Sequence, residues 1–292
     1  MPAKILDGSK IAARALEKVK REVGELEKKG VTPKLVVIQV GDDEASTIYV
    51  NKKHRTCIEL GMGSEIKRLP KTITYDGLLG EIHGLNSDND VHGILVQLPL
   101  PEQLAHRKAL EAISIAKDVD GLHPYNHGMN MLGKDCFQPA TPMGIMGLLK
   151  STGEELEGKN AVVIGRSNIV GKPLALMLLN AGCTVTICHS RTKRLSEFTK
   201  LADILVSATG KPGLVKDAMV KKGAIVIDVG INRLRNGKIS GDVDFGKVQK
   251  KASWITPVPG GVGPMTIASL MQNTLRACVE QTSGKGADKG AP

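Results

Sequence analysis

The sequence contains few aromatic residues. Phe, Trp and Tyr make up 2% of its 292 residues, too few for the stacking platforms with which proteins bind single-stranded nucleic acids. A formal net charge of +10 would nevertheless suit a phosphate backbone. The basic residues, however, are interspersed with acidic ones along stretches such as 17–29, as on a solvated helix. We therefore expect no nucleic-acid partner and a general preference for small anions.

Paired cysteines and long apolar runs are also missing. The chain has five cysteines and no CxxC motif, and this pattern argues against both a disulfide framework and a zinc site. The cysteines are Cys57, Cys136, Cys183, Cys188 and Cys278. No apolar run approaches membrane-spanning length, and the first residues, MPAKILDGSK, contain no apolar signal core. We expect a cytoplasmic protein with reduced thiols, no metal and no membrane partner.

The first half of the chain alternates between strand and helix patterns. A length of 292 residues, with 41% hydrophobic and 24% charged, favours two domains of ordinary size. Asp7 can cap a helix that Gly30 ends. Apolar runs rich in β-branched residues predict buried strands, and apolar residues at helical spacing predict helices. The strands are expected at 34–40, 64–69 and 91–97, and the helices at 44–60 and 75–86. Such alternation indicates a parallel α/β sheet.

The second half of the chain also alternates between strand and helix patterns, but it does not repeat the sequence of the first half. Residues 121–142 lose periodicity and predict an irregular connection, after which Thr141 and Pro142 suit the N-cap and first turn of a new helix. Strands are then expected at 160–164, 184–188, 204–208 and 224–228, with a helix from about residue 171. We place the domain boundary between residues 147 and 148. The final stretch, 283–292, is rich in Gly and Lys and is expected to be disordered.

A glycine turn follows the first strand of the second half. In VVIGRSNIVGKP, 162–173, it lies between a buried strand and a helix that carries Gly171 and Pro173 near its start. There, backbone N–H groups and the positive end of the helix can hold a dinucleotide pyrophosphate. The spacing is not GxGxxG, so a plain tight turn is the alternative.

The residues after the next strand distinguish NADP from NAD. NAD-binding sheets place a carboxylate there for the ribose hydroxyls, whereas NADP requires cationic or neutral groups for its 2′-phosphate. Here residues 189–194 read HSRTKR, without a carboxylate, and Arg166 in the glycine turn can add a guanidinium group. We therefore predict NADP. The alternative is that 189–194 is only a solvated basic loop.

Six long and unusual stretches run along nearly the whole chain. They are YVNKK (49–53), VHGILVQLPLP (91–101), KDVDGLHPYNHG (117–128), PATPMG (139–144), GRSNIVGKP (165–173) and TPVPGGVGPMT (256–266). In this order they resemble the bifunctional methylenetetrahydrofolate dehydrogenase/methenyltetrahydrofolate cyclohydrolase family. The resemblance implies an α/β fold of two domains with a cleft between them: an N-terminal parallel α/β catalytic domain that binds folate (1–147) and a Rossmann-type NADP-binding domain (148–263). A last helix, about 264–282, would pack back on the first domain, and the protein would be a homodimer.

The resemblance also implies a pair of reactions in one-carbon metabolism. NADP+ takes hydride from 5,10-methylenetetrahydrofolate, and the methenyl product is hydrolysed to 10-formyltetrahydrofolate, which serves purine biosynthesis. By similarity Lys53 is the catalytic residue, with Tyr49 and Gln97 beside it, and Asp120 holds the pterin. The implied cofactor contacts are Gly165, Arg166, Ser167, Ser190 and Ile231. The further implied substrate contacts are Val96, Leu98, Pro259, Gly260, Gly261, Val262, Gly263, Pro264, Met265, Thr266 and Ile267. One departure from the family pattern is Ala140, where many relatives have cysteine; no inferred chemical role depends on this position.

The spacing within YVNKK suits this chemistry. Tyr49 and Lys53 are four residues apart and share a helical face, whereas Lys52 points about 100° away. Loss of hydride needs mainly positioning, because the flanking nitrogens stabilise the cation. Attack of water needs a proton acceptor, and a lysine can serve only if burial and a cationic neighbour lower its pKa. From spacing alone, the alternative is that Tyr49 packs on the core and Lys53 extends its amine into water.

Other implied residues also have plainer alternatives. Gln97 follows a buried strand, where its amide could contact an amine or serve only the turn. Asp120 can accept two N–H bonds from the pterin. The alternative is that Asp118 and Asp120 both only cap a turn, and the choice of Asp120 over Asp118 rests on the resemblance. Three glycines within 259–263 allow close approach of a flat ligand, and Pro264 suits the start of the last helix.

Two other functions stay open on the residues alone. One is a different two-domain NADP oxidoreductase, such as a shikimate-dehydrogenase-like enzyme, in which Lys53 would assist a small hydroxy acid. The other is a basic nucleic-acid-binding protein.

Overall fold

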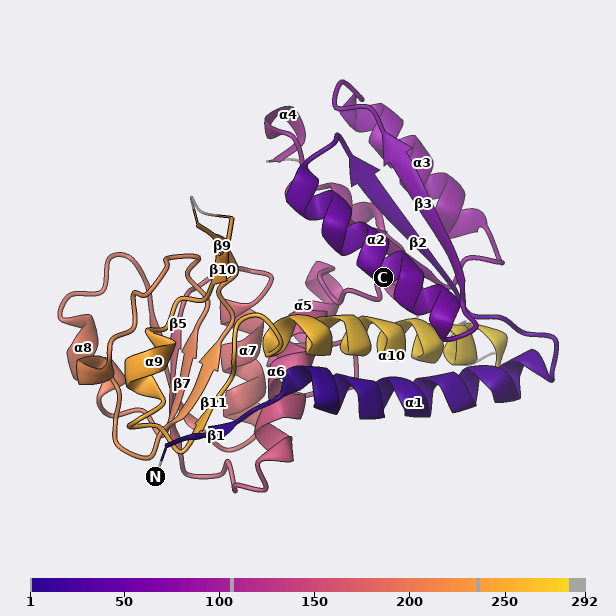
Figure 1. The fold of residues 1–292 in the computed structure, drawn as a ribbon. Coiled ribbons are helices and arrows are strands. Elements are labelled where there is room, and N and C mark those ends of the chain that lie inside the picture. Colours follow the sequence, from indigo (N-terminus) through magenta and orange to yellow (C-terminus); the bar gives the residue numbers. More distant parts are fainter. Residues whose placement is uncertain (1, 106–107, 235–236, 284–292) are drawn as a thin grey trace. The chain divides into compact units, whose positions relative to one another are not determined.

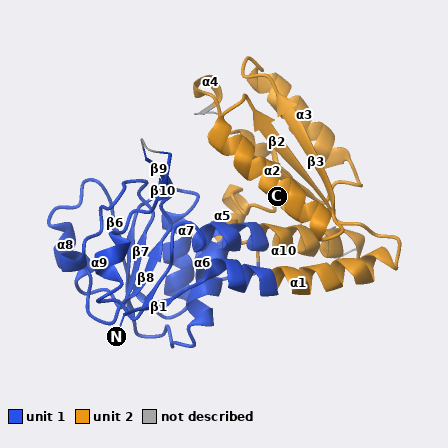
Figure 2. Ribbon diagram, in the orientation of Figure 1, with its two compact units in different colours: residues 1–14, 129–135, 141–269 blue, residues 15–128, 136–140, 270–292 orange. Residues whose placement is uncertain are grey.

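The structure, a computed structural model, describes residues 2–105, 108–234 and 237–283. The chain forms two compact units, each assembled from separate stretches (Figures 1 and 2). Unit 1 comprises residues 1–14, 129–135 and 141–269, and unit 2 comprises residues 15–128, 136–140 and 270–292. The predicted domain bounds at 147/148 and 263, and the cleft between the domains, stay predictions. The predicted disordered tail lies outside the described residues, apart from Ser283.

Unit 2 contains a three-stranded parallel sheet. The central strand β2 (Lys34–Val40) pairs with β3 (Gly63–Leu69) on one side and with β4 (Gly93–Val96) on the other. Because side chains alternate along a strand, Leu35 and Val37 join one core cluster while Val36 and Ile38 join another. The predicted parallel α/β sheet is thereby confirmed, although β4 is shorter than the predicted strand 91–97.

Helices cover both faces of this sheet. The cluster with Leu35 and Val37 also takes buried residues from α2 (Glu44–Glu59), from the second part of α1 (Gly8–Glu27) and from the second part of α10 (Val262–Thr282). The opposite cluster takes buried residues from α3 (Tyr75–Ser87), from the short helix α4 (Glu102–Ala105) and from the 3₁₀ helix η1 (Ala109–Ala112). As predicted, Asp7 caps α1, because its carboxylate accepts a hydrogen bond from the N–H of Lys10 (3.0 Å). Gly30 follows the helix with a φ of 76°, a conformation that favours glycine.

The stretch 121–142 is more regular than predicted. It contains the helix α5 (Pro124–Met131), and the next helix, α6 (Ala140–Ser151), already begins at Ala140. Thr141 therefore lies inside the first turn instead of at the N-cap. The missed helix is polar and short, so it carries little apolar periodicity; buried side-chain bonds fix it instead. Asn126 donates to the carboxylate of Asp118 (2.7 Å) and accepts from the N–H of Phe137 (3.3 Å).

Unit 1 is built on a six-stranded parallel sheet with the order β1-β11-β8-β7-β5-β6. The strands are β1 (Lys4–Ile5), β5 (Asn160–Ile164), β6 (Thr184–Cys188), β7 (Ile204–Ser207), β8 (Ile225–Asp228) and β11 (Trp254–Ile255). The chain runs from β5 to the edge strand β6 and returns to β7 on the other side of β5. This doubly wound order confirms the predicted Rossmann-type sheet and creates a topological switch point between β5 and β7.

The remaining elements of unit 1 surround this sheet (Figure 1). Helix α7 (Gly171–Asn180) packs on β5 and β6, and α8 (Leu195–Thr199) contacts β6. Unit 1 also contains most of α6, the first parts of α1 and α10, the 3₁₀ helix η3 (Asp217–Met219) and α9 (Phe245–Val248). A hairpin of β9 (Asn232–Arg233) and β10 (Ile239–Ser240) completes it. The edge strand β1 was not predicted. A strand of two residues has no pattern of its own, and it forms because β11 offers free backbone groups about 250 residues later in the chain.

Candidate active site

Lys53 lies on the buried side of α2. The residues of this side are Ser46, Val50, Lys53 and Cys57, whereas Lys52 is exposed. Lys53 is only 9% exposed, and its Nζ donates a hydrogen bond to Oε1 of Gln97 at 2.9 Å. The alternative in which this amine extends into water is therefore wrong. Tyr49, one turn earlier, is half-buried, and burial raises the pKa of its hydroxyl.

Gln97 is held from two sides at the end of β4. Its backbone N–H donates to the carbonyl of Ile38 (2.8 Å), which extends the ladder with β2 by one residue. Its side-chain Nε2 donates to the carbonyl of Leu98 (2.6 Å). This second bond fixes the orientation of the amide and leaves Oε1 facing Lys53. The amide of Gln97 thus bonds both to the backbone of the turn and to the amine of Lys53.

The structure separates the roles of the two neighbouring aspartates. Asp118 is 2% exposed and accepts hydrogen bonds from the N–H groups of Leu122 (3.2 Å) and His123 (2.8 Å) as well as from Asn126. Its oxygens are thus occupied in holding the start of α5. No protein donor to the carboxylate of Asp120 is found among the described residues. Within this part of the chain, the carboxylate of Asp120 thus keeps its acceptor oxygens available.

Lys53 and Asp120 influence each other electrostatically. Burial lowers the pKa of the Lys53 amine, and the charge of Asp120 opposes this shift. Burial raises the pKa of Asp120 to about 6; Lys53 opposes this shift, and Asp118 adds to it. Both groups are thus displaced towards their neutral forms. Shifts of this kind, caused by burial and by a neighbouring charge, are typical of active-site groups.

The neighbours of Gln97 present different groups. Val96 is 3% exposed and packs in the cluster with α3, so its side chain faces away from Lys53 and only its backbone could contact a ligand. Leu98 is partly buried and precedes a cis peptide bond to Pro99.

A cavity of about 360 Å³ lies at the switch point of unit 1. Its lining residues are Ile164, Gly165, Arg166, His189, Ser190, Thr192, Leu195, Ala208, Thr209, Lys211 and Leu214. They come from the ends of β5, β6 and β7, where doubly wound sheets bind ligands. Three predicted cofactor residues, Gly165, Arg166 and Ser190, are among them. Ser167 and Ile231 are not.

The glycine turn beside this cavity cannot carry side chains at two positions. Gly165 has a φ of 129°, and a Cβ there would collide with the carbonyl oxygen of Ala208. A Cβ on Gly171 would collide with the carbonyl oxygen of Gly165. Ser167 has a structural part, since its Oγ accepts hydrogen bonds from the N–H groups of Val170 (3.2 Å) and Gly171 (3.3 Å) at the start of α7. Glycine is therefore required at these two positions by the close packing of the turn itself, which lies at the positive end of α7.

The sequence did not reveal Thr209 and Lys211, which line the cavity after β7. Both are positioned by Asp242, a fully buried residue 30 or more positions later. Its carboxylate accepts hydrogen bonds from the N–H of Thr209 (2.7 Å), the hydroxyl of Thr209 (2.9 Å) and the N–H of Lys211 (2.9 Å). It also accepts from Ser207 (3.0 Å) and Asn232 (3.1 Å). The available signal was that a loop after β7 must adjoin the loop after β5.

The predicted folate segment 259–267 belongs to unit 1. It begins after a cis peptide bond between Val258 and Pro259, and Gly260 has a φ of 103°. Helix α10 starts at Val262, so the prediction that Pro264 begins this helix is wrong by two residues. Pro264 fits inside the first turn because N–H groups there have no intrahelical partner. The predicted substrate residues thus divide between the units, and only those of unit 2 are placed together here.

Two family models match this chain. One describes the catalytic domain of tetrahydrofolate dehydrogenase/cyclohydrolase and matches residues 6–120, and the other describes the NAD(P)-binding domain of the same enzyme and matches residues 139–282. The chain belongs to the tetrahydrofolate dehydrogenase/cyclohydrolase family. The family predicted from the six sequence stretches is thereby confirmed.

Members of this family are similar over almost the full chain. The bifunctional protein FolD of Moorella thermoacetica is 54% identical over 277 residues, which cover 95% of this chain and 99% of the relative. The crystal structure of the bifunctional FolD of Campylobacter jejuni is 52% identical, with a TM-score of 0.93 over 94% of this chain and 98% of that one. The FolD of Trypanosoma brucei, complexed with NADP and an inhibitor, is 37% identical, with a TM-score of 0.94 over 97% and 99%.

Shikimate dehydrogenases resemble the chain only in fold. The enzyme of Aquifex aeolicus is 14% identical, with a TM-score of 0.50 over 86% of this chain and 97% of that one. The alternative of a shikimate-dehydrogenase-like enzyme is therefore not favoured over the family assignment.

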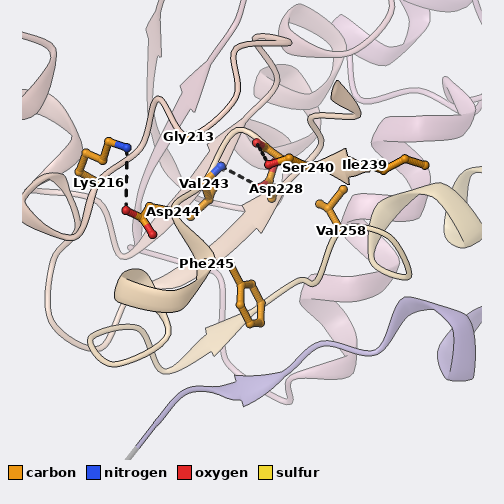
Figure 3. Close-up of a pocket in the computed structure, with 10 residues that line it drawn as sticks. Gly213, Lys216, Asp228, Ile239, Ser240, Val243, Asp244, Phe245 and Val258 are labelled. Atoms are coloured by element: carbon orange, nitrogen blue, oxygen red, sulfur yellow. Dashed lines mark hydrogen bonds and ion pairs between the residues drawn. The ribbon is translucent and has the colours of Figure 1, made fainter. Parts of the chain in front are cut away.

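A second cavity of unit 1, about 320 Å³, contains none of the residues that the family resemblance implied (Figure 3). Its polar groups already have partners. Lys216 pairs with Asp244 at 3.8 Å, and Asp228 accepts from the N–H groups of Asp242 and Val243, both at 2.9 Å. Burial raises the pKa of Asp228 to about 6. This cavity is therefore bounded by groups that serve the fold.

Two kinds of feature are absent from the described residues. Within them, no helix combines the length and apolar character needed to cross a bilayer. The same part of the chain holds no group of three or more His, Cys, Asp or Glu side chains placed to bind a metal ion. The five cysteines are all buried thiols.

Proposed function

We propose that this protein catalyses two successive reactions of tetrahydrofolate. It oxidises 5,10-methylenetetrahydrofolate to the 5,10-methenyl form with NADP+, and it hydrolyses the methenyl form to 10-formyltetrahydrofolate. The observation that carries this assignment is the buried amine of Lys53, held by Gln97 beside Asp120 in a member of this family. The relatives named as bifunctional enzymes confirm the enzyme class and the reaction pair predicted from the sequence.

The cavity at the switch point suits NADP. At Gly165 and Gly171 the backbone packs too closely for a Cβ, and the positive end of α7 adjoins this turn, where it can attract a pyrophosphate. Arg166 and the loop of residues 189–194 provide cationic and hydroxyl groups for a 2′-phosphate and contain no carboxylate. We assign Gly165, Arg166 and Ser190 to direct contacts, and Ser167 and Ile231 to the flanks. When bound, NADP+ supplies the hydride acceptor.

The first reaction, hydride transfer, requires little acid–base catalysis from the protein. The carbon that loses hydride lies between two nitrogens whose lone pairs stabilise the cation, so the rate depends mainly on the geometry of binding. We assign Asp120 to the aminopyrimidinone edge of the pterin, because its carboxylate can accept two parallel N–H bonds. Tyr49 would pack on the rings, and the glycines of 259–263 would allow a flat ligand to approach.

The second reaction requires a proton acceptor. Water must lose a proton as its oxygen bonds to the methenyl carbon, and a charged lysine cannot take that proton. Burial lowers the pKa of Lys53, and the positive methenyl group would lower it further. Gln97 holds the amine through a neutral oxygen, which orients it without restoring a full negative charge beside it. Lys53 can therefore act as the base of the hydrolysis.

The compartment and the partners of the protein are also part of the proposal. Five buried thiols suit a reducing compartment, and we place the protein in the cytoplasm. The homodimer and the absence of nucleic-acid and membrane partners rest on the resemblance and on the composition of the chain.

Replacing Lys53 by Met tests the assignment. Both activities are measured on one purified preparation, with methylenetetrahydrofolate and NADP+ for the first and methenyltetrahydrofolate for the second. We expect the Lys53→Met enzyme to lose cyclohydrolase activity by about 10²- to 10⁴-fold, the usual contribution of a general base, while part of the dehydrogenase activity remains. Lys52→Met, on the exposed side of the same helix, should retain both. Equal retention of the two activities in Lys53→Met would refute the role of the amine.

A further inference from the structure

Gln39, near the end of β2, has one oxygen without a partner. The side chain is 1% exposed, and its Nε2 donates a hydrogen bond to Oγ1 of Thr47 at 2.7 Å. Among the described residues, its Oε1 is the only buried side-chain oxygen or nitrogen for which no hydrogen-bond partner is found. Buried amide oxygens are almost always bonded, so an exception calls for an explanation.

Exchanging the oxygen and nitrogen of the Gln39 amide by a 180° rotation would not give all of its polar atoms a hydrogen-bond partner. The hydroxyl of Thr47 donates its one hydrogen to the carbonyl of Asp43 (2.9 Å), so towards Gln39 it can only accept. Rotating the amide by 180° would place two acceptors against each other and leave the nitrogen unpaired. The orientation is therefore fixed by α2, and Oε1 is the free end.

The strand register places Gln39 beside Gln97. Strands β2 and β4 are parallel with Ile38 opposite Val96, and the N–H of Gln97 bonds to the carbonyl of Ile38. The next residues along the two strands, Gln39 and Gln97, are thus neighbours at about the 4.8 Å spacing of a sheet. Both amides reach α2, one at Thr47 and the other at Lys53, so they lie on the same face. Gln39 therefore lies one strand away from the residue that holds the proposed catalytic amine.

A water that attacks a carbon needs two acceptors. One of its protons passes to the base, the other O–H needs an acceptor to hold it in place, and the remaining lone pair then points at the carbon. In the proposed hydrolysis the water oxygen bonds to the cationic methenyl carbon and one proton moves to the neutral amine of Lys53. The products of this step are a neutral hydroxy adduct and an ammonium group. Nothing assigned so far accepts the second O–H.

We propose that Oε1 of Gln39 accepts this second O–H and thereby orients the attacking water. The inference rests on the proposed bifunctional reaction and adds a residue that acts only in its hydrolytic half. Hydride transfer consumes no water, so the dehydrogenase half does not need Gln39. This separates Gln39 from residues that bind the folate, whose loss would affect both halves.

The variant Gln39→Met tests the proposal, because Met has a similar length and presents no amide oxygen. We expect the kcat of the cyclohydrolase to fall by about tenfold or more, as for a misplaced reactant, and the kcat and KM values of the dehydrogenase to stay within about twofold. The melting temperature should not fall by more than in Thr47→Val, which removes the same amide bond. Because that bond orients the amide, Thr47→Val should also lower the cyclohydrolase activity, by less than Gln39→Met, and should leave the dehydrogenase unchanged.

The outcomes separate this inference from the proposed function. If the unmodified protein lacks cyclohydrolase activity, the proposed function fails; if it has both activities and Gln39→Met lowers both equally or neither, only the role of Gln39 fails. Should the Met variant not fold, Gln39→Glu serves instead, because it keeps an acceptor oxygen and adds a charge that raises the pKa of Lys53. Its cyclohydrolase activity should recover towards that of the unmodified enzyme as the pH is raised, and an unchanged deficit at every pH would overturn the proposal.

Discussion

At the scale of single residues, two aspartates two positions apart differ entirely in what they touch. The carboxylate of Asp118 accepts three hydrogen bonds around the start of α5, whereas Asp120 acts on Lys53 through its charge. A negative charge near an amine stabilises the ammonium form and raises its pKa. The carboxylate that we assign to the pterin therefore also sets the pH at which the base becomes neutral.

Asp120→Asn should shift the pH dependence of the hydrolysis to lower pH. Without the charge of Asp120, burial alone acts on Lys53 and its pKa falls further, so the amine becomes neutral at lower pH. The measurement is the kcat of the cyclohydrolase against pH at saturating methenyltetrahydrofolate, where the activity rises as Lys53 loses its proton. A rising limb that stays in place or moves to higher pH would contradict this coupling.

Asp118→Asn is the matched control for that experiment. It should leave the rising limb in place and instead lower the stability by about 1–3 kcal/mol, the cost of leaving buried donors without an acceptor.

At the scale of elements, the ends of parallel strands assemble the cofactor cavity. The loops after β5, β6 and β7 line it, and Asp242 ties the loop after β7 to Ser207 and Asn232. Where the backbone leaves the sheet after β7, the buried carboxylate of Asp242 thus accepts five hydrogen bonds in place of the regular bonds between strands. Such a satisfied network is rigid, and breaking one member is costly.

Asp242→Asn should weaken NADP+ binding and lower stability together. The amide group of Asn would face donors, so we expect a loss of about 2–4 kcal/mol, within the range for breaking a buried charged network, and a raised KM for NADP+. Asp244→Asn, which removes only surface ion pairs with Lys216 and Lys247, should cost less than about 1 kcal/mol. Thermal melting and dehydrogenase kinetics measure both; an unchanged KM in Asp242→Asn would remove its positioning role.

At the scale of the whole molecule, both units depend on distant parts of the chain. Unit 1 takes its edge strand β1 from the first residues, and unit 2 takes the second part of α10 from the last described ones. In unit 2, Asn273 of α10 donates to the carbonyls of Val119 (2.8 Å) and Gln138 (3.0 Å). Neither unit is therefore a continuous segment that could be excised whole.

Deleting residues 2–5 should destabilise unit 1 although these residues touch no assigned site residue. The deletion removes β1 and its backbone bonds, such as that from the N–H of Lys4 to the carbonyl of Ser253 (2.8 Å), and uncovers the edge of β11. We expect a lower melting temperature and a smaller stabilisation by NADP+. Lys4→Ala keeps the strand and loses only the contact of the amine with the Trp254 ring (4.9 Å), so its effect should be below about 1 kcal/mol. Equal melting temperatures for the two variants would contradict this part for β1.

The sequence by itself determined the elements whose side chains repeat. The strands 34–40, 160–164 and 184–188 were predicted with the bounds that β2, β5 and β6 have. β2 and β5 are buried and are apolar runs, whereas the edge strand β6 is rich in β-branched residues. The spacing of YVNKK likewise placed Tyr49 and Lys53 on one face of a helix, apart from Lys52, and the family motifs supplied the chemistry.

Only the tertiary structure decided which of these residues meet. It distinguished Asp120 from Asp118, placed Gln39 beside Gln97, brought Asp242 to Thr209 and recruited two residues as β1. The physical reason is that periodicity along a chain reports which side of an element is buried, whereas a hydrogen bond or a strand pairing depends on partners that can be hundreds of residues away.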